Sequence, residues 1–313
     1  MTVSDRYRRL RTELRGLLGK RAKQTDIGVG AAIPGGNDPA GAPVRDAESL
    51  DYEAIEMARL IFYALKGWNT TDLVIHAADE VSDFTEGRIS EVLGRMKKGE
   101  PIQYVLGECR FYGLTLAVRP GVLIPRQETE ELVEIIVDAN TGRRDLRVLD
   151  VGTGSGAIAL ALARNLEFPE VTALDVSREA LSVAEENARR LRADIRFIEA
   201  DIFTWQPAEG SLDIIVSNPP YVMESEEKEM EAHVLDWEPR QALFVPDSDP
   251  LRYYRRIAEI GTKALVPGGQ IYFEINPLCA DGMVAMMEKT GYTGVAVEKD
   301  ICGKRRFVLG FRC

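Results

Sequence analysis

The alternation of helix-like and strand-like segments in the C-terminal two thirds of the chain is the feature that most constrains its fold. From Leu132 onward, apolar residues at helical spacing and short runs rich in valine and isoleucine follow one another with short connections. Such alternation is typical of a mostly parallel, doubly wound sheet with helices on both faces. Ligands bind such sheets beyond the carboxyl ends of the strands. The sequence therefore predicts an α/β, Rossmann-like domain with its site at that edge.

The same periodicity gives the expected elements. Strands are predicted at 147–151, 171–174, 195–198, 212–216 and 270–275, with two more near Val295 and Phe307. Helices are predicted at 132–139, 157–164, 181–191, 254–265 and 280–289. The loops that follow the parallel strands are therefore the places to search for a functional site.

The first 124 residues are organised differently. Residues 1–23 are basic, which favours a helix with a solvated charged face over an RNA-binding arm or a transit peptide. Residues 24–46 are rich in glycine and proline and are expected to form a flexible linker. Helical spacing predicts a small helical domain at 47–107, and strand and turn residues predict a β-hairpin at 108–124. The hairpin would join a large domain at 125–313.

Size and cysteine usage limit the class of protein. With 313 residues, 45% of them hydrophobic, the chain can bury one large and one small core. It has no apolar run of membrane-spanning length, and its N-terminus lacks the apolar core of a secretory signal. The four cysteines are far apart and have no metal-ligand spacing, so no bound metal and no disulfide framework are expected. These observations predict a cytoplasmic protein without membrane contact, and we expect a monomer.

The charge balance limits the kind of partner. The formal net charge is −11 although the first 23 residues are basic, so the remainder of the chain is strongly acidic. Affinity for nucleic acid comes largely from lysine and arginine that displace counterions from phosphates. We therefore expect no direct contact with nucleic acid and instead a protein partner.

A glycine-rich loop follows the first predicted strand and opens an alanine-rich helix. Its sequence is Asp150-Val151-Gly152-Thr153-Gly154-Ser155-Gly156. Glycines in this context let the backbone approach a ligand closely. Two other interpretations stay open, because Gly152, Gly154 and Ala157 also fit the dinucleotide-binding pattern and because a glycine turn can serve packing alone.

Carboxylates recur at the ends of the first three predicted strands. Asp150 ends the first strand, Asp175 ends the second and Asp201 follows the third. Such a rim can accept hydrogen bonds from the ammonium group, ribose hydroxyls and adenine amine of S-adenosylmethionine, and it favours this cation over a pyrophosphate. Ile202 would then flank the adenine. Alternatively, Asp201 caps the turn that follows it and Ile202 belongs to the core.

The tetrapeptide Asn218-Pro219-Pro220-Tyr221 follows the apolar strand predicted at 212–216. Consecutive prolines have no backbone N–H and hold their carbonyls rigidly, so this segment suits a functional loop. We expect the Asn218 side-chain oxygen and the Pro219 carbonyl to accept the two N–H bonds of a planar amide or nucleobase amine, with Tyr221 stacked on it. This grip would align the nitrogen for in-line methyl transfer.

These segments together resemble the release-factor glutamine N5-methyltransferases of the HemK/PrmC type. The resemblance runs from about residue 46 to the C-terminus and includes residues 99–107, 111–113, 123–130, 237–243, 268–269 and 273–275 besides the two loops. It implies a class I S-adenosylmethionine-dependent methyltransferase fold at 125–313 and a helical substrate-recognition domain at 47–107. It also implies methyl transfer to the glutamine of Gly-Gly-Gln in peptide chain release factors, with S-adenosylhomocysteine as product.

Several alternatives remain open at this stage. The Asn-Pro-Pro-aromatic geometry also fits a flipped adenine or guanine of nucleic acid. Ribosomal-protein glutamine methyltransferases resemble this family too, but usually carry a Pro-Arg-Ser-Pro-type sequence at the Pro125-Arg126 segment, whereas this chain has Glu128-Thr129-Glu130 there, as release-factor enzymes do. Gln127 itself replaces the proline that is commoner in the family. A non-catalytic adaptor would be expected to have a damaged loop, whereas both loops are intact.

Three groups of charged residues lie near the two loops in the sequence. Arg126 and the glutamates that follow it either cap the next helix and pair along it or act near the site. Glu238 and Arg240 are interpreted as a structural ion pair that shapes the loop over the substrate. The acidic residues Glu224, Glu226, Glu227, Glu229 and Glu231 are interpreted as a solvated loop that can steer a basic protein. The chain's own Gly268-Gly269-Gln270 is interpreted as a helix-to-strand turn rather than a methylation target.

Overall fold

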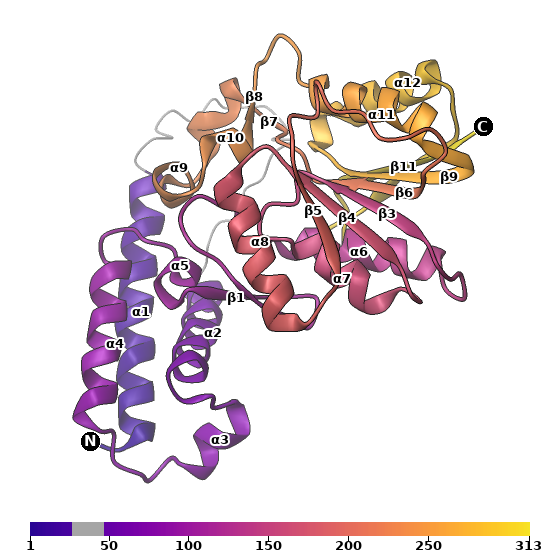
Figure 1. Ribbon diagram of the computed structural model, residues 1–313. Coiled ribbons are helices and arrows are strands. Elements are labelled where there is room, and N and C mark those ends of the chain that lie inside the picture. The colour runs from indigo at the N-terminus through magenta and orange to yellow at the C-terminus, as the bar shows by residue number, and fades with distance from the viewer. Residues whose placement is uncertain (27–46) are drawn as a thin grey trace. The chain divides into compact units, whose positions relative to one another are not determined.

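The computed structural model describes residues 1–26 and 47–313 and divides into two compact units (Figure 1). The N-terminal unit comprises Met1–Leu106 together with Glu231–Asp236. The C-terminal unit comprises Gly107–Met230 and Trp237–Cys313. Most of the predicted linker at 24–46 lies outside the described residues, and its first three residues end the first helix. Within the described ranges, no helix is long and apolar enough to cross a membrane.

The N-terminal unit is helical. Its helices are α1 (Val3–Asp26), α2 (Ala47–Lys66), α3 (Thr70–Ile75), α4 (Asp83–Met96) and α5 (Ile102–Leu106), and most of α9 (Ala232–Trp237) also belongs to it. α4 begins where Ser82 Oγ accepts a hydrogen bond from the backbone N–H of Thr85, which satisfies one of the free donors of the first turn. Apolar residues of α1, α2 and α4 meet in one core. This burial, rather than local propensity, stabilises such short helices.

The basic helix α1 is more deeply packed than a solvated basic segment would be. Leu10 and Leu14 are fully buried, and so is Arg6, whose side chain is 2% exposed. Arg6 Nε lies 2.6 Å from Oε2 of Glu86, and its Nη1 lies 3.2 Å from Oε2 of Glu13. Two carboxylates therefore compensate the buried guanidinium. The first helix is consequently part of the core of this unit, while Arg8 and Arg9 stay exposed.

The C-terminal unit is built on a central sheet. Its strands are β3 (Arg147–Val151), β4 (Glu170–Asp175), β5 (Ile195–Glu199), β6 (Leu212–Ser217), β9 (Leu265–Glu274), β10 (Tyr292–Lys299) and β11 (Arg305–Arg312). In the described part of the chain they lie in the order β10-β11-β9-β6-β3-β4-β5. The five strands from β9 to β5 are parallel, and β11 and β10 extend the sheet antiparallel. The predicted mostly parallel, doubly wound sheet is confirmed.

Helices cover both faces of this sheet (Figure 1). One face packs against α6 (Gln127–Ala139), α7 (Ala157–Asn165) and α8 (Arg178–Leu191), and the other against α11 (Arg252–Ala264) and α12 (Ala280–Thr290). Their apolar residues recur at helical spacing, as in Leu132, Val133 and Ile136 of α6. The strands between them are apolar on both sides, which is why they read as continuous hydrophobic runs.

The hairpin predicted at 108–124 forms over its first ten residues. β1 (Glu108–Phe111) pairs antiparallel with β2 (Leu114–Ala117). The two connecting residues, Tyr112 and Gly113, have φ of 45° and 74°, and positive φ at both positions is the geometry of the tight turn that matches strand twist. Phe111 and Leu116 enter the core on the α6, α7 and α8 face.

Smaller elements follow β6. They are β7 (Val222–Met223), the 3-10 helix η1 (Glu224–Glu229), α10 (Arg240–Leu243), β8 (Phe244–Val245) and a second 3-10 helix η2 (Pro277–Cys279). The turn predicted at Gly268-Gly269 lies inside β9, because Leu265 already pairs with Leu212 and regular pairing resumes at Gln270. Gly268 has φ of 76° in this irregular stretch.

Candidate functional site

The glycine loop connects β3 to α7 at the carboxyl edge of the sheet. Gly152, Gly154 and Gly156 have φ of 75°, 57° and 83°, a region that other residues adopt with strain. A side chain on Gly156 would crowd α8, since its Cβ would lie 3.1 Å from Cβ of Ala184. A Cβ on Gly152 or Gly154 would meet no atom of the described residues within 4 Å. Those two glycines therefore border open space that a ligand can occupy, and Gly156 serves packing.

Asp150 is the last but one residue of β3 and is fully buried. Its Oδ2 accepts hydrogen bonds from Thr153 Oγ1 at 2.6 Å and from the backbone N–H of Ala159 at 3.2 Å, so it fixes the loop to the start of α7. Its Oδ1 is buried without a hydrogen-bond partner among the described residues. Burial raises the pKa of this carboxyl to about 7. Such an oxygen fits a ligand that brings a cationic donor.

Asp175, the last residue of β4, lies beside the same loop. Its Oδ2 accepts from the backbone N–H of Gly154 at 2.9 Å, and its Oδ1 accepts from that of Ser177 at 2.9 Å. Burial raises the pKa of Asp175, and these backbone hydrogen bonds oppose the rise. Each oxygen retains capacity for another donor.

Thr153 and Ser155 of the glycine loop are both buried. The carbonyl of Ser155 accepts a hydrogen bond from Asn187 Nδ2 at 2.9 Å, so α8 also holds the loop.

The third predicted carboxylate, Asp201, forms a hydrogen bond within its own turn. Asp201 is exposed, and its Oδ1 accepts from the backbone N–H of Phe203 at 2.9 Å, which is the capping arrangement considered from sequence. Ile202 is 7% exposed and packs in the core on the α11 and α12 face. Phe203 lies more open, with the guanidinium carbon of Arg252 4.8 Å from its ring centre. Asp201 therefore makes the capping hydrogen bond and Ile202 lies in the core, while the adenine contact expected of both residues stays a prediction.

The tetrapeptide begins where β6 ends. Pro219 is buried, whereas Asn218, Pro220 and Tyr221 are half-buried. Nδ2 of Asn218 donates to Oε2 of Glu274 at 2.9 Å and to Oγ1 of Thr129 at 3.1 Å. No hydrogen bond among the described residues engages Oδ1 of Asn218 or the carbonyl of Pro219. These two acceptors at the carboxyl edge of the sheet therefore have no partner within the described part of the chain.

Glu274 organises this corner. It ends β9, is 1% exposed, and accepts from Thr129 Oγ1 at 2.6 Å on Oε2 and from the Tyr221 hydroxyl at 3.1 Å on Oε1. Burial raises the pKa of Glu274, while the hydrogen bonds from Thr129 and Tyr221 and the charge of Arg306 oppose the rise. Its backbone carbonyl accepts from the Tyr254 hydroxyl at 3.0 Å. The carboxylate thus accepts hydrogen bonds from Thr129, Asn218 and Tyr221. A buried carboxylate with three donors holds the residues around it rigidly.

Sequence reasoning missed Glu274 and Thr129 as site residues. In the sequence, Glu274 belongs to the family-like segment 273–275, and a carboxylate directly after the apolar run 271–273 is itself a signal. Such a charge at the end of a buried strand needs partners, and parallel strands end at one edge. Thr129 lies on α6 among glutamates, and its spacing gave no indication that it points inward.

The predicted ion pair between Glu238 and Arg240 is wrong. Glu238 is 4% exposed and pairs with Arg126, whose Nη2 lies 2.6 Å from Oε1; its Oε2 accepts from the backbone N–H of Ile124 at 3.1 Å. Arg240 pairs with Glu227 at 2.6 Å. Arg126 therefore precedes α6 without a side-chain capping hydrogen bond and instead fixes the segment that enters this helix.

The acidic run 224–229 is also more structured than a solvated loop. It forms η1, and Glu226 accepts from the backbone N–H of Met223 at 2.8 Å and from Nδ2 of Asn276 at 2.7 Å. Asn276 also donates to the carbonyl of Tyr221 at 3.3 Å. The run is therefore tied to the end of the tetrapeptide.

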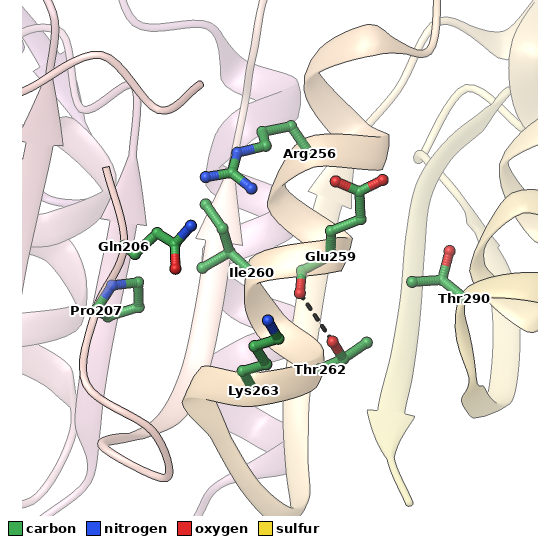
Figure 2. Close-up of a pocket in the computed structure, with 8 residues that line it drawn as sticks. All are labelled: Gln206, Pro207, Arg256, Glu259, Ile260, Thr262, Lys263 and Thr290. Carbon is green, nitrogen blue, oxygen red and sulfur yellow. Dashed lines mark hydrogen bonds between the residues drawn. The ribbon is translucent and has the colours of Figure 1, made fainter. Parts of the chain in front are cut away.

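A cavity of about 430 Å³ lies elsewhere in the C-terminal unit (Figure 2). It is lined by Gln206, Pro207, Arg256, Glu259, Ile260, Thr262, Lys263 and Thr290. Arg256 is held there by the carbonyls of Ile202 and Trp205 at 2.9 and 3.0 Å. None of the predicted site residues lines this cavity, so it is not the predicted site.

Comparisons with known proteins decide the family. Residues 46–107 match the PrmC N-terminal domain, and residues 126–243 match the methyltransferase small domain. The chain is 47% identical over 261 residues to the release factor glutamine methyltransferase of Bacteroides thetaiotaomicron, covering 83% of this chain and 93% of that protein. The enzyme of the same name from Flavobacterium psychrophilum is 42% identical over 86% of this chain and 93% of its own length. The chain belongs to the release factor glutamine methyltransferases.

The family predicted from the sequence motifs is thereby confirmed, and the protein is a methyltransferase. A third member, from Streptococcus pneumoniae, is 44% identical over 71% of this chain and 79% of that protein. The methyltransferase small domain match at 126–243 contains both the glycine loop and the Asn218 tetrapeptide. The two loops therefore lie within one domain and at one edge of its sheet.

Proposed function

We propose that this protein transfers a methyl group from S-adenosylmethionine to the side-chain nitrogen N5 of the glutamine in the Gly-Gly-Gln motif of peptide chain release factors. S-adenosylhomocysteine is the second product. The observation that carries the proposal is the orientation of Asn218. Its Nδ2 donates to Glu274 and Thr129, so its Oδ1 is left without a partner among the described residues, as is the carbonyl of the next residue, Pro219. The names of the relatives support a release factor as the substrate.

Two neighbouring acceptors suit a primary carboxamide. The nitrogen of an amide is a poor nucleophile because its lone pair is delocalised into the carbonyl. The Asn218 side-chain oxygen and the Pro219 carbonyl would accept its two N–H bonds and stabilise positive charge that develops on the nitrogen as the new N–C bond forms and the bond from the methyl carbon to sulfur breaks. The alkylated nitrogen would then lose one proton to a carbonyl or to water, which leaves a neutral N-methyl amide. Tyr221, whose hydroxyl is tethered to Glu274, would limit the substrate amide to one plane. The Asn218 oxygen would need no rearrangement to do so, since the hydrogen bonds of Nδ2 set the direction of the amide before substrate binds.

The glycine loop and its carboxylates fit the methyl donor. S-adenosylmethionine supplies an electrophilic methyl carbon on a sulfonium sulfur. The open space beside Gly152 and Gly154 would let the cofactor lie close to the backbone. Thr153, Ser155 and Gly156 of the same loop would also contact it. Asp175 would bind the ribose hydroxyls. Asp150 would compensate the ammonium group through its unpartnered Oδ1, and Asp201 and Ile202 would border the adenine.

The helical unit is proposed to bind the release factor. It matches the PrmC N-terminal domain and contains none of the residues assigned to the chemistry. A release factor is a translation protein, so we expect the enzyme to act in the cytoplasm. We also expect it to be a monomer. We expect no direct contact with nucleic acid, because the body of the chain is acidic.

One competition assay tests the substrate class. The protein is incubated with methyl-labelled S-adenosylmethionine and, in the same tube, a purified release factor, ribosomal proteins and nucleic acid. Label on the release factor is the expected result. Label on nucleic acid would establish an adenine or guanine methyltransferase instead, and label on a ribosomal protein would move the enzyme to the neighbouring family. Cofactor binding without transfer to any of the three would indicate an adaptor.

A further inference from the structure

We propose that Glu274 is a positioning residue that fixes the orientation of the Asn218 amide, and that this orientation makes the site select a carboxamide over a carboxylate. The inference rests on the proposed function and adds the origin of its substrate specificity. The side-chain amide of Asn218 has two possible orientations, which exchange Oδ1 and Nδ2 and have nearly the same shape. The choice decides whether the site offers an oxygen or an NH2 group to the substrate.

The fold brings the two residues together. β6 and β9 are parallel neighbours in the sheet, and Ser217 is paired with Phe273. The residues that follow these two, Asn218 and Glu274, therefore leave the sheet at the same edge. Nδ2 of Asn218 lies 2.9 Å from Oε2 of Glu274. Thr129 reaches the same oxygen from α6, with its hydroxyl 2.6 Å away.

The hydrogen-bond balance of this cluster allows one orientation. An ionised carboxylate only accepts hydrogen bonds, so it requires the NH2 end of the Asn218 amide. The Thr129 hydroxyl gives its single proton to Glu274 and therefore offers only lone pairs to Asn218, which donates to it at 3.1 Å. The NH2 end of the Asn218 amide therefore faces this cluster inside the protein. A flipped amide would place its oxygen against the carboxylate and lose both hydrogen bonds.

The orientation has a direct consequence for the substrate. Oδ1 of Asn218 and the Pro219 carbonyl form a pair of acceptors, which a glutamine side chain satisfies with its two N–H bonds. A glutamate side chain at the same position brings only oxygens and would face two acceptors without a proton between them. Sites that hydrogen-bond a donor discriminate strongly against an analogue that lacks it, because buried polar groups are left unpaired.

Two variants and a matched control test this role. Glu274→Gln replaces an acceptor-only group by one that can also donate, which permits the flipped Asn218 amide. Thr129→Val removes the hydroxyl at nearly constant shape, and Thr129→Ser is the control that retains it. Each protein is assayed with a release factor carrying Gly-Gly-Gln. The inhibition constant of a competitor factor with glutamate in place of that glutamine is measured in parallel, together with the affinity for S-adenosylmethionine.

We expect Glu274→Gln to lower kcat by about tenfold or more, the equivalent of about 1.4 kcal/mol, with cofactor affinity within about twofold of the wild type. The glutamate-containing competitor should bind about tenfold better relative to the glutamine-containing factor than it does in the wild type. Thr129→Val should shift this ratio in the same direction, and Thr129→Ser should leave it unchanged. The change in the ratio is the signature of orientation, since loss of packing would weaken both factors alike.

Two outcomes overturn separate parts of the account. If the wild type transfers methyl to the factor but neither variant changes the ratio of the two factors, Glu274 does not orient Asn218 and only stabilises the corner. A Glu274→Gln protein that does not fold leaves Thr129→Val and Thr129→Ser to decide. If the wild type does not methylate the factor at all, the proposed function fails and the inference falls with it.

Discussion

Nδ2 of Asn218 donates to Oε2 of the buried Glu274 at 2.9 Å, across the ends of two neighbouring parallel strands. Because Nδ2 faces Glu274, Oδ1 of the same amide points the other way and can accept a hydrogen bond from a substrate. The direction of an acceptor is thereby fixed before any substrate arrives. Preorganisation of this kind is a large part of how enzymes stabilise charge that develops during reaction.

Replacing Asn218 by alanine should abolish methyl transfer while leaving cofactor affinity nearly unchanged. The loss of one positioned acceptor should lower kcat by roughly a hundredfold or more. Asn165→Ala serves as the control, since Asn165 is an exposed asparagine whose Nδ2 donates to the carbonyl of Ala161 within α7. Turnover of Asn218→Ala equal to that of the control would remove Asn218 from the mechanism.

Gly154 and Gly156 should respond differently to alanine. Both have positive φ, which costs about 1 kcal/mol for alanine. At Gly156 the added Cβ also meets Ala184 and Leu160 at 3.1 and 3.2 Å, so unfolding free energy should fall by roughly 2 to 4 kcal/mol in total. At Gly154 the Cβ enters open space, so stability should fall little and cofactor affinity by about tenfold or more. Calorimetric unfolding and cofactor titration measure the two effects, and equal losses of affinity in stable proteins would contradict the assignment.

Cofactor affinity should depend on pH through Asp150. The buried carboxyl has a pKa of about 7, so it is mostly neutral below this value and ionised above it. A cationic ligand that pairs with Asp150 favours the ionised form, so affinity should rise with pH, by up to about tenfold per unit, between pH about 5 and about 7. Asp150→Asn should bind more weakly and show a flat profile over this range in isothermal titration. The same slope in both proteins would show that Asp150 does not pair with the cofactor.

The buried Glu238 should stabilise the segment before α6. In Glu238→Ala the buried N–H of Ile124 loses its acceptor and Arg126 loses its ion-pair partner. The free energy of unfolding should fall by roughly 2 to 4 kcal/mol. Glu238→Gln keeps an acceptor for one of the two donors and should lose less, as denaturant unfolding would show. Equal losses for both substitutions would mean that packing, rather than hydrogen bonding, is what Glu238 contributes.

Much of the fold could be predicted from the sequence because it depends on local periodicity. The strand at 147–151 and the helix that follows Gly156 are set by runs of apolar residues and by a glycine loop, all within about 20 positions. The tetrapeptide could be found in the same way, since its prolines and its place after β6 are local features.

The partners inside the site could not be predicted because they are distant in sequence. Asn218 and Glu274 are 56 positions apart, Thr129 and Asn218 are 89 apart, and Arg126 and Glu238 are 112 apart. Such contacts between distant residues depend on which strands become neighbours in the sheet. The periodicity of the sequence does not specify that strand order. The ion pair expected between Glu238 and Arg240 shows the error that results, since residues two positions apart were preferred over a distant partner. The burial of the Asp150 side chain likewise depends on how α7 packs over β3.

The central claim is that two oxygen acceptors hold a glutamine amide for methylation. The most direct test is to map the methyl group by peptide mass spectrometry after incubating the protein with S-adenosylmethionine and a purified release factor, with Asn218→Ala in parallel. The account predicts a single methyl on the side-chain nitrogen of the Gly-Gly-Gln glutamine with the wild type and none with the variant. A methyl group on any other residue of the factor, or the same modification by Asn218→Ala, would contradict it.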